Sequence, residues 1–194
     1  MASGSPDNSS KTAVDGARTI ALQMLEERGR GAVLVGVARV DTALEHLLQA
    51  VMGPGPVQGD GLFLPDRPLG SLGAKAALAS RLGLIDAPVA QALAVLRKLR
   101  NAFAHSADSA SLADPAHSAR LAEVVSQARS NPLWDPLETV LATQPPTPHG
   151  MLDPALRDYI LLITILVAFL EAMAQQLRPY QPPVVMGFSG VMVS

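Results

Sequence analysis

The sequence predicts an all-α, single-domain bundle of five to six helices. Its 194 residues fit one compact domain, and 48% of them are hydrophobic whereas only 4% are aromatic. The core must therefore consist mainly of Leu, Ala and Val, which favours packed helices because Ala and Leu have high helix propensity. Strand-like alternation occurs only at 184–193, where two glycines weaken it. We predict a disordered segment over 1–12, the bundle over 13–178 and a Pro-rich apolar tail over 179–194.

Two helices are predicted before the first strong stop signal. Residues 13–28 place apolar side chains on one face, and Gly29 and Gly31 break this pattern. A longer helix is predicted over 32–52, and the Gly-Pro-Gly-Pro run at 53–56 ends it. Its core-facing stripe has the spacing of three and four residues that is typical of an amphipathic helix. The stripe consists of Leu34, Val37, Val40, Leu44, Leu47, Leu48 and Val51.

The third and fourth helices follow a long loop over 57–70. Ser71 is a suitable N-cap for the third helix, and Gly83 is a suitable residue at its C-terminal end. Asp86 caps the fourth helix, which has a proline in its first turn and runs to about Ala104. The apolar stripe of this fourth helix consists of Val89, Leu93, Leu96, Leu99 and Phe103.

The C-terminal part of the bundle has the same kind of start signals. An Asp-Pro pair at 114–115 begins a helix that ends near Arg129, and another begins the last helix over 153–177. The Pro-rich stretch over 131–150 is irregular, with a short helix at 137–142. The last helix is apolar nearly all round, so we expect it to lie at the centre of the bundle or to be shared with a partner chain.

Composition excludes several classes of protein. The apolar run at 159–170 is too short to cross a bilayer, which needs about 20 residues, and residues 1–10 do not have the pattern of a signal peptide. We therefore expect a cytoplasmic protein without a membrane-bound state. The absence of cysteine excludes disulfides and thiolate metal sites, and no His-Glu-x-x-His or Walker spacing is present, so we expect no cofactor or metal. The net charge of −2 argues against non-specific nucleic-acid binding through bulk charge.

The segment 96–106 has the one spacing that suggests chemistry. If it is helical, Arg97, Asn101 and His105 line one face at i, i+4 and i+8, while Arg100 lies about 140° round the helix from His105. A histidine titrates near neutral pH and can move a proton, and a guanidinium can hold a phosphate. One straight helix cannot focus both groups on one phosphate, so a catalytic site would need a helix end or a symmetric dimer.

Two weaker candidates lie elsewhere. Gly70 and Ser71 precede a predicted helix with Lys75 nearby, and backbone N–H groups there could bind an anion. The alternative is a tight turn into a packed helix, which we favour. Asp41 and Glu45 share a face of the second helix without a convincing metal-ligand spacing, so we interpret them as part of a solvated or salt-bridged face.

Together, three blocks resemble a known family. The runs RPLGSLGAK at 67–75, LGLI at 82–85 and LRKLRNAFAHS at 96–106, in this order and separation, are similar to the mannitol operon repressor family. That resemblance implies an all-helical fold without a helix-turn-helix and, for the family's namesake, a regulatory role in transcription. The match covers about forty residues well.

The third block alone also resembles the wider HEPN group of helical bundles. This second resemblance implies a HEPN-like bundle, and dimers in which two Arg/His motifs meet near the two-fold axis. In active members of the group it also implies RNA cleavage without a metal. Arg100 and His105 are the positions that match the motif, with Asn101 beside them.

We therefore expect a helical regulatory protein that influences transcription through a protein partner, and a homodimer. One alternative is a metal-independent ribonuclease in which His105 moves the proton, Arg100 stabilises the phosphate and Asn101 orients the imidazole. A second alternative is a non-catalytic accessory protein. In that case Asn101 and His105 cap carbonyls at the helix end and Arg100 pairs with an acid such as Glu45 or Asp41 on the second helix.

Overall fold

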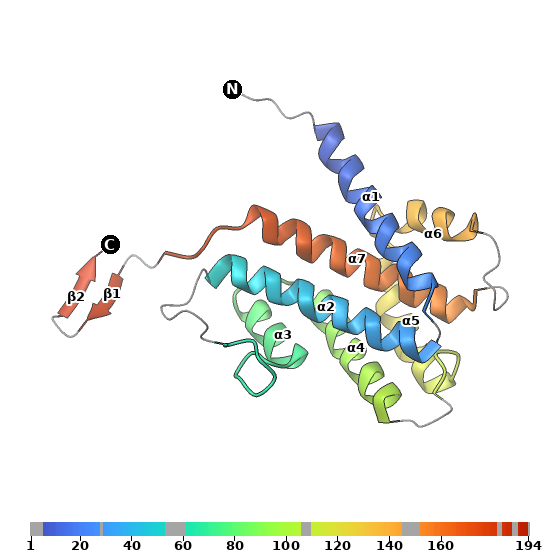
Figure 1. The fold of residues 1–194 in the computed structure, drawn as a ribbon, viewed down its shortest axis with the longest axis horizontal. Coiled ribbons are helices and arrows are strands. Elements are labelled where there is room, and N and C mark those ends of the chain that lie inside the picture. The colour runs from blue at the N-terminus through green and yellow to red at the C-terminus, as the bar shows by residue number, and fades with distance from the viewer. Residues whose placement is uncertain are drawn as a thin grey trace.

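The computed structural model describes residues 6–27, 29–52, 61–105, 110–144, 152–181, 184–187 and 190–193, and their side chains from residue 16 to 181. Within these ranges the chain forms seven helices and one hairpin (Figure 1). The helices are α1 (Pro6–Leu25), α2 (Gly29–Met52), α3 (Leu72–Arg81), α4 (Ala87–His105), α5 (Pro115–Ala128), α6 (Trp134–Ala142) and α7 (Pro154–Gln176). The hairpin pairs β1 (Val184–Gly187) with β2 (Gly190–Val193) in antiparallel register.

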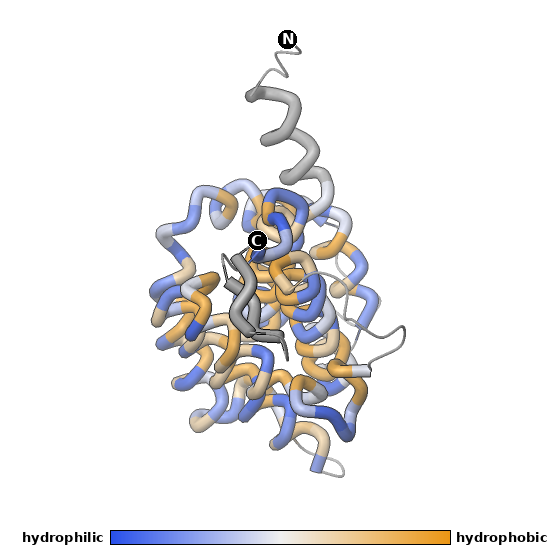
Figure 2. The backbone as a smooth tube through the Cα atoms, turned by 90° about the vertical axis from the view of Figure 1, so that its left-hand side faces the viewer, coloured by the Kyte–Doolittle hydropathy of each residue, from blue (hydrophilic) through white to orange (hydrophobic). Residues whose placement is uncertain are grey.

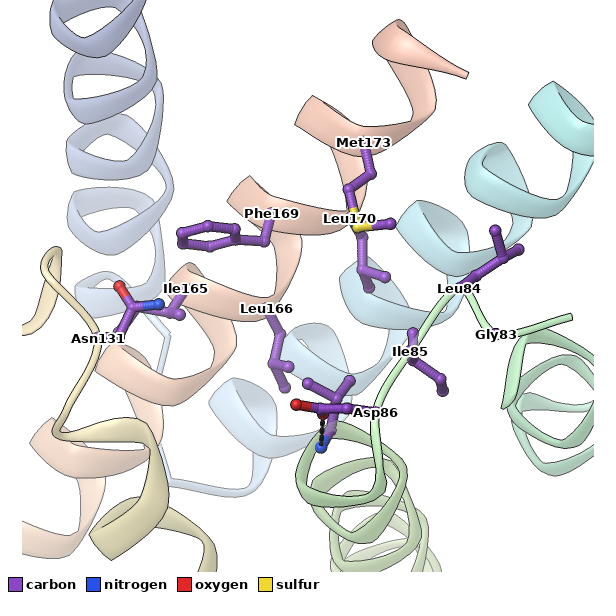
Figure 3. A pocket seen from close by; sticks show the side chains of 11 residues that line it. Gly83, Leu84, Ile85, Asp86, Asn131, Ile165, Leu166, Phe169, Leu170 and Met173 are labelled. Atoms are coloured by element: carbon purple, nitrogen blue, oxygen red, sulfur yellow. Dashed lines mark hydrogen bonds between the residues drawn. The ribbon is translucent and has the colours of Figure 1, made fainter. Parts of the chain in front are cut away.

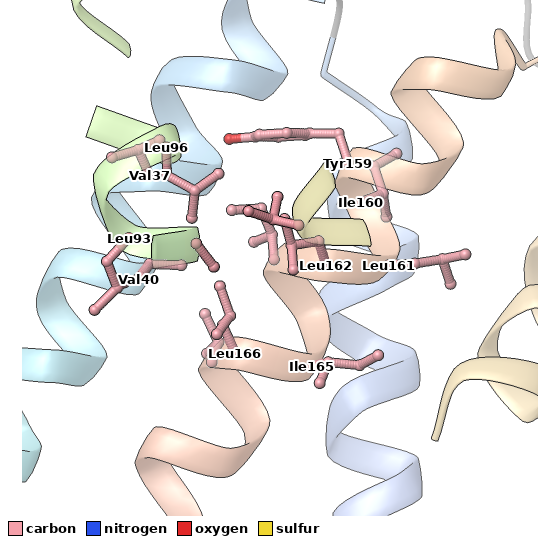
Figure 4. Close-up of a cluster of buried hydrophobic side chains, with 14 of the residues drawn as sticks. Val37, Val40, Leu93, Leu96, Tyr159, Ile160, Leu161, Leu162, Ile165 and Leu166 are labelled. Atoms are coloured by element: carbon pink, nitrogen blue, oxygen red, sulfur yellow. The ribbon is translucent and has the colours of Figure 1, made fainter. Parts of the chain in front are cut away.

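Helix α7 is the central element of the bundle, which is one of the two arrangements that its apolar sequence predicts. Every residue from Tyr159 to Val167 is buried, and α2 packs along it while α1, α5 and α6 contact it from other sides. Figure 4 shows side chains of α2 and α4, among them Val37 and Leu96, facing those of α7. Hydrophobic positions gather between the helices and hydrophilic positions lie at the periphery (Figure 2). This burial of apolar surface is the main driving force for the fold.

A glycine allows α2 and α7 to approach closely. The fully buried Tyr159 donates a hydrogen bond from its hydroxyl to the Val33 carbonyl oxygen at 2.8 Å. A Cβ atom on Gly36 would lie 2.5 Å from that hydroxyl oxygen and 3.0 Å from Met24 Cε. Burial raises the pKa of Tyr159 far above its usual value, so the phenol stays a neutral donor throughout the physiological pH range.

Several predicted boundaries need correction. Helix α1 begins at Pro6, so it covers much of the segment over 1–12 that was predicted to be disordered, while residues 1–5 lie outside the described part. Proline fits the first turn of a helix because its missing N–H has no partner there in any case. Helix α2 begins at Gly29, which places both glycines of the predicted break in its first turn. Helix α6 begins at Trp134, three residues before the predicted start.

The C-terminal tail is not purely irregular. The alternating segment forms the hairpin, in which Gly187 pairs with Gly190 and Val184 with Val193. Gly187 and Gly190 form the last pair of this ladder, so both glycines lie within the described strands. The hairpin lies beyond the end of α7, so the bundle itself is all-α (Figure 1). Among the described residues, no helix combines the length and the apolar character needed to span a membrane.

Candidate functional site

Helix α4 carries a group of exposed polar side chains in its last three turns, which we call the basic face. It consists of Arg97, Lys98, Arg100, Asn101 and His105. At 100° per residue these positions span an arc of about 160°. The opposite side of α4 packs into the core through Val95, Leu96, Leu99 and Phe103. The predicted helical face is therefore confirmed, and all of its polar side chains are accessible to solvent.

The charge of the basic face is opposite to that of the whole chain. Residues 87–105 contain two arginines, one lysine and one histidine but no aspartate or glutamate, whereas the full sequence has a net charge of −2. Positive charges three or four residues apart on a helix repel each other modestly. Because no acidic residue on α4 compensates this repulsion, the cluster does not stabilise the helix. It is better suited to binding an anionic partner.

The end of α4 is capped by a residue that sequence reasoning missed. The Arg30 guanidinium, at the start of α2, donates to the Ala104 carbonyl oxygen at 3.2 Å. In the part of the chain that the structure describes, no hydrogen bond or ion pair engages the side chains of Arg100, Asn101 or His105. The predicted capping role of Asn101 and His105 therefore has no support. No sequence signal indicated Arg30, because it is 74 residues from Ala104.

The acidic pair on α2 has a different partner from the one predicted. Lys75 Nζ lies 3.1 Å from Asp41 Oδ2 and 2.8 Å from Glu45 Oε2, and its side chain is only 2% exposed. The same ammonium group lies 6.0 Å from the centre of the Phe63 ring. The prediction that Arg100 pairs with Asp41 or Glu45 is therefore wrong. Asp41 and Glu45 are one helical turn apart on α2, so both can pair with Lys75 of α3. These ion pairs hold α3 against α2.

The predicted anion site at the start of α3 loses its lysine for the same reason. Ser71 is the N-cap of α3, and its hydroxyl accepts a hydrogen bond from Ala74 N at 3.2 Å. Gly70 packs against the carbonyl oxygens of Leu64 and Pro65, where a Cβ atom would collide. These contacts are those of a tight turn into a packed helix. The ammonium group of Lys75 pairs with Asp41 and Glu45 of α2, so its charge is not available to an anion at this turn.

Arg97 is the member of the basic face that lies nearest to this turn. A Cβ atom on Gly73 would be 3.2 Å from Arg97 Nη1, so the guanidinium lies directly over the bare backbone of α3. Both residues line a shallow cleft of about 240 Å³ between α3 and α4. The absence of a side chain at Gly73 gives Arg97 room to extend along this cleft. The Arg97 end of the basic face therefore lies against the start of α3.

The described side chains provide few other chemical groups. They contain no cluster of three or more His, Asp or Glu residues that could hold a metal ion. Arg100 and His105 both reach solvent but lie on different sides of the basic face, about 140° apart. Ser106, the last residue of the quoted motif, lies outside the described residues. In one chain these residues therefore form a surface suited to binding. Catalysis at a single phosphate would also need groups from a second chain.

Comparisons with protein-family models, curated proteins and solved structures found no match to this chain. The resemblance to the mannitol operon repressor family and to the HEPN group therefore remains a prediction from the quoted residues.

Proposed function

We propose that this chain is a helical regulatory protein that influences transcription by binding an acidic protein partner through the basic face of α4. The observation that carries this proposal is the exposure of Arg97, Lys98 and Arg100 on a helix without acidic residues. A cluster of like charges gains most from a surface of opposite charge, which speeds association and selects against wrong partners. The role in transcription is what the family resemblance implies.

A protein partner suits this surface better than a long stretch of nucleic acid. The chain as a whole is slightly acidic, with an isoelectric point near 6.0, and its basic face is limited to a few side chains at the end of α4, whereas a long polyanion needs an extended positive surface. A second copy that met the same face across a two-fold axis would bring like charges together. The homodimer predicted from the sequence is therefore proposed to form through another surface, unless an anion lies between the two faces.

Charge reversal on the basic face tests the proposal. In a strain that lacks this protein, we expect wild-type protein to restore the normal transcript profile and the double variant Arg97→Glu/Arg100→Glu to fail. The matched control Arg81→Glu/Arg120→Glu changes the net charge equally at exposed positions on α3 and α5 and is expected to restore the profile. Because all four side chains are exposed, the free energy of unfolding should stay within about 0.5 kcal/mol per substitution.

Two results would contradict the proposal. Full restoration by the Arg97→Glu/Arg100→Glu variant would show that the basic face is not needed. Tight binding of the purified wild-type protein to the DNA of a regulated promoter, with a steep dependence on salt, would show direct action on DNA instead of action through a protein partner.

A second candidate function is metal-independent RNA cleavage. The observation that favours it is that Arg100 and His105 are exposed and have no partner among the described residues. Two copies would have to meet around the RNA strand, because Arg100 and His105 of one chain lie about 140° apart on the helix. His105 of one copy would take the proton from a ribose 2′-hydroxyl whose oxygen attacks phosphorus, the bond to the 5′-oxygen would break to leave a cyclic phosphate, and the 5′-oxygen would take a proton from water. An arginine at position 100 of the second copy would stabilise the charge on the phosphate. In excess chelator, wild type should then cleave RNA and His105→Ala should lose at least about 100-fold in rate. Equal cleavage by both proteins, or none by either, would remove this function.

A further inference from the structure

A groove of about 480 Å³ lies between the C-terminal half of α7, the connection from α3 to α4 and the turn before α6. Its walls include Leu84 and Ile85 on one side and Phe169 and Met173 on the other (Figure 3). The Phe169 side chain is 44% exposed, although it borders a largely buried helix. This volume falls in the range of roughly 300–1,000 Å³ that is typical of small-molecule sites.

Two polar side chains at the groove, the exposed Asp86 and the half-buried Asn131, have hydrogen-bonding atoms that no described residue engages. Asp86 Oδ1 accepts from Val89 N at 2.9 Å, which leaves the second carboxylate oxygen without a partner in the described part of the chain. Asn131 Oδ1 accepts from Leu133 N at 2.9 Å, which leaves its amide nitrogen as a donor. The residues that line the groove include this one carboxylate and no cationic side chain.

From this arrangement we infer that the groove binds a small molecule with an apolar body and a protonated amine. The apolar body fills the space between Ile85 and Phe169, and the ammonium group pairs with the free oxygen of Asp86. An acid of the same shape would bring a second carboxylate towards Asp86 and would be rejected. An alcohol would lose the ionic contact but keep the apolar one.

The site does not overlap the basic face. Val89 is the last residue of α4 that lines the groove and Arg97 is the first residue of the basic face, so the two surfaces are separated by about 12 Å along the helix axis. A molecule in the groove would contact α4 only at its start. Loss of binding at one surface can therefore be measured independently of the other.

Three probes of matched shape test the inference on the full-length chain: 4-phenylbutylamine, 4-phenylbutan-1-ol and 4-phenylbutanoate. Binding is followed by NMR titration of the backbone amides. We expect the amine to bind about tenfold more tightly than the alcohol and the acid to bind most weakly. Amides of residues 83–86 and 165–173 should shift. The substitution Phe169→Ala should weaken binding of the amine and the alcohol.

Asp86→Asn is the decisive variant, because asparagine caps a helix about as well as aspartate and the fold should be kept. We expect it to reduce the preference for the amine over the alcohol to about twofold or less. The control Asp66→Asn removes an equal charge from an exposed position that does not line the groove, and should leave the preference unchanged. The inference would be overturned if no probe bound below about 5 mM, or if Asp86→Asn kept the tenfold preference.

Discussion

Replacing Lys75 by methionine is expected to lower the free energy of unfolding by about 3 kcal/mol. The ammonium group is almost fully buried and is the only described ion-pair partner of Asp41 and Glu45, whose side chains are 32% and 29% exposed. Without it, two carboxylates one helical turn apart would face each other, and Asp41 already has one buried oxygen without a hydrogen bond in the described part of the chain. Urea denaturation followed by circular dichroism measures the loss.

A matched variant isolates the electrostatic part of this effect. In the background Asp41→Asn/Glu45→Gln, the substitution Lys75→Met should reduce stability much less, because no uncompensated charge remains. A loss below about 0.5 kcal/mol for Lys75→Met alone would contradict the structure, because it would place the lysine at the surface.

The second large effect is expected at Gly36, where an added methyl group should lower the free energy of unfolding by about 2–3 kcal/mol. Helix propensity alone would make Gly→Ala stabilising by about 1 kcal/mol. The opposite sign is expected because a Cβ atom would collide with the hydroxyl of Tyr159, which is fixed by its hydrogen bond to Val33. Thermal and urea unfolding of the purified variant give the sign and size.

Two controls separate the collision from helix propensity. Gly16→Ala lies in α1, where the added Cβ atom has no neighbour within 4 Å, so it should be stabilising. The double variant Gly36→Ala/Tyr159→Phe should recover part of the loss because the obstructing hydroxyl is removed. If Gly36→Ala proved as stabilising as Gly16→Ala, the close approach of α2 and α7 would be wrong.

The helical core could be predicted from the sequence because periodicity is a local signal. The stripe that includes Val37, Val40 and Leu44 follows helical geometry, and the structure buries all three. The apolar character of the last helix predicted that it is either central or shared with a partner chain, and the structure places it at the centre of the bundle. Boundaries were less well predicted, since the start of α1 at Pro6 and the glycines at the start of α2 run against composition and propensity. No packing contact explains the start of α2, because Gly29 is exposed and a Cβ atom there would have no neighbour within 4 Å.

The candidate site could be predicted only in part. Spacing alone placed Arg97, Asn101 and His105 on one face of α4, and their exposure agrees with a polar stripe opposite an apolar one. Spacing could not assign Asp41 to Lys75 or Arg30 to Ala104, because these contacts depend on how distant helices cross. The groove was missed because three separate segments build it, each with an ordinary sequence.

The most direct test is site-specific photo-crosslinking in living cells, with a photoreactive amino acid introduced at Ala104, which lies within the basic face between Arg100 and His105 and is exposed. We predict one discrete adduct with a second protein, lost when Arg97→Glu/Arg100→Glu is also present. The same photoreactive residue at Ser80, an exposed position on α3, should give no such adduct. Absence of an adduct at position 104, or an adduct that persists after charge reversal, would contradict the proposed partner surface.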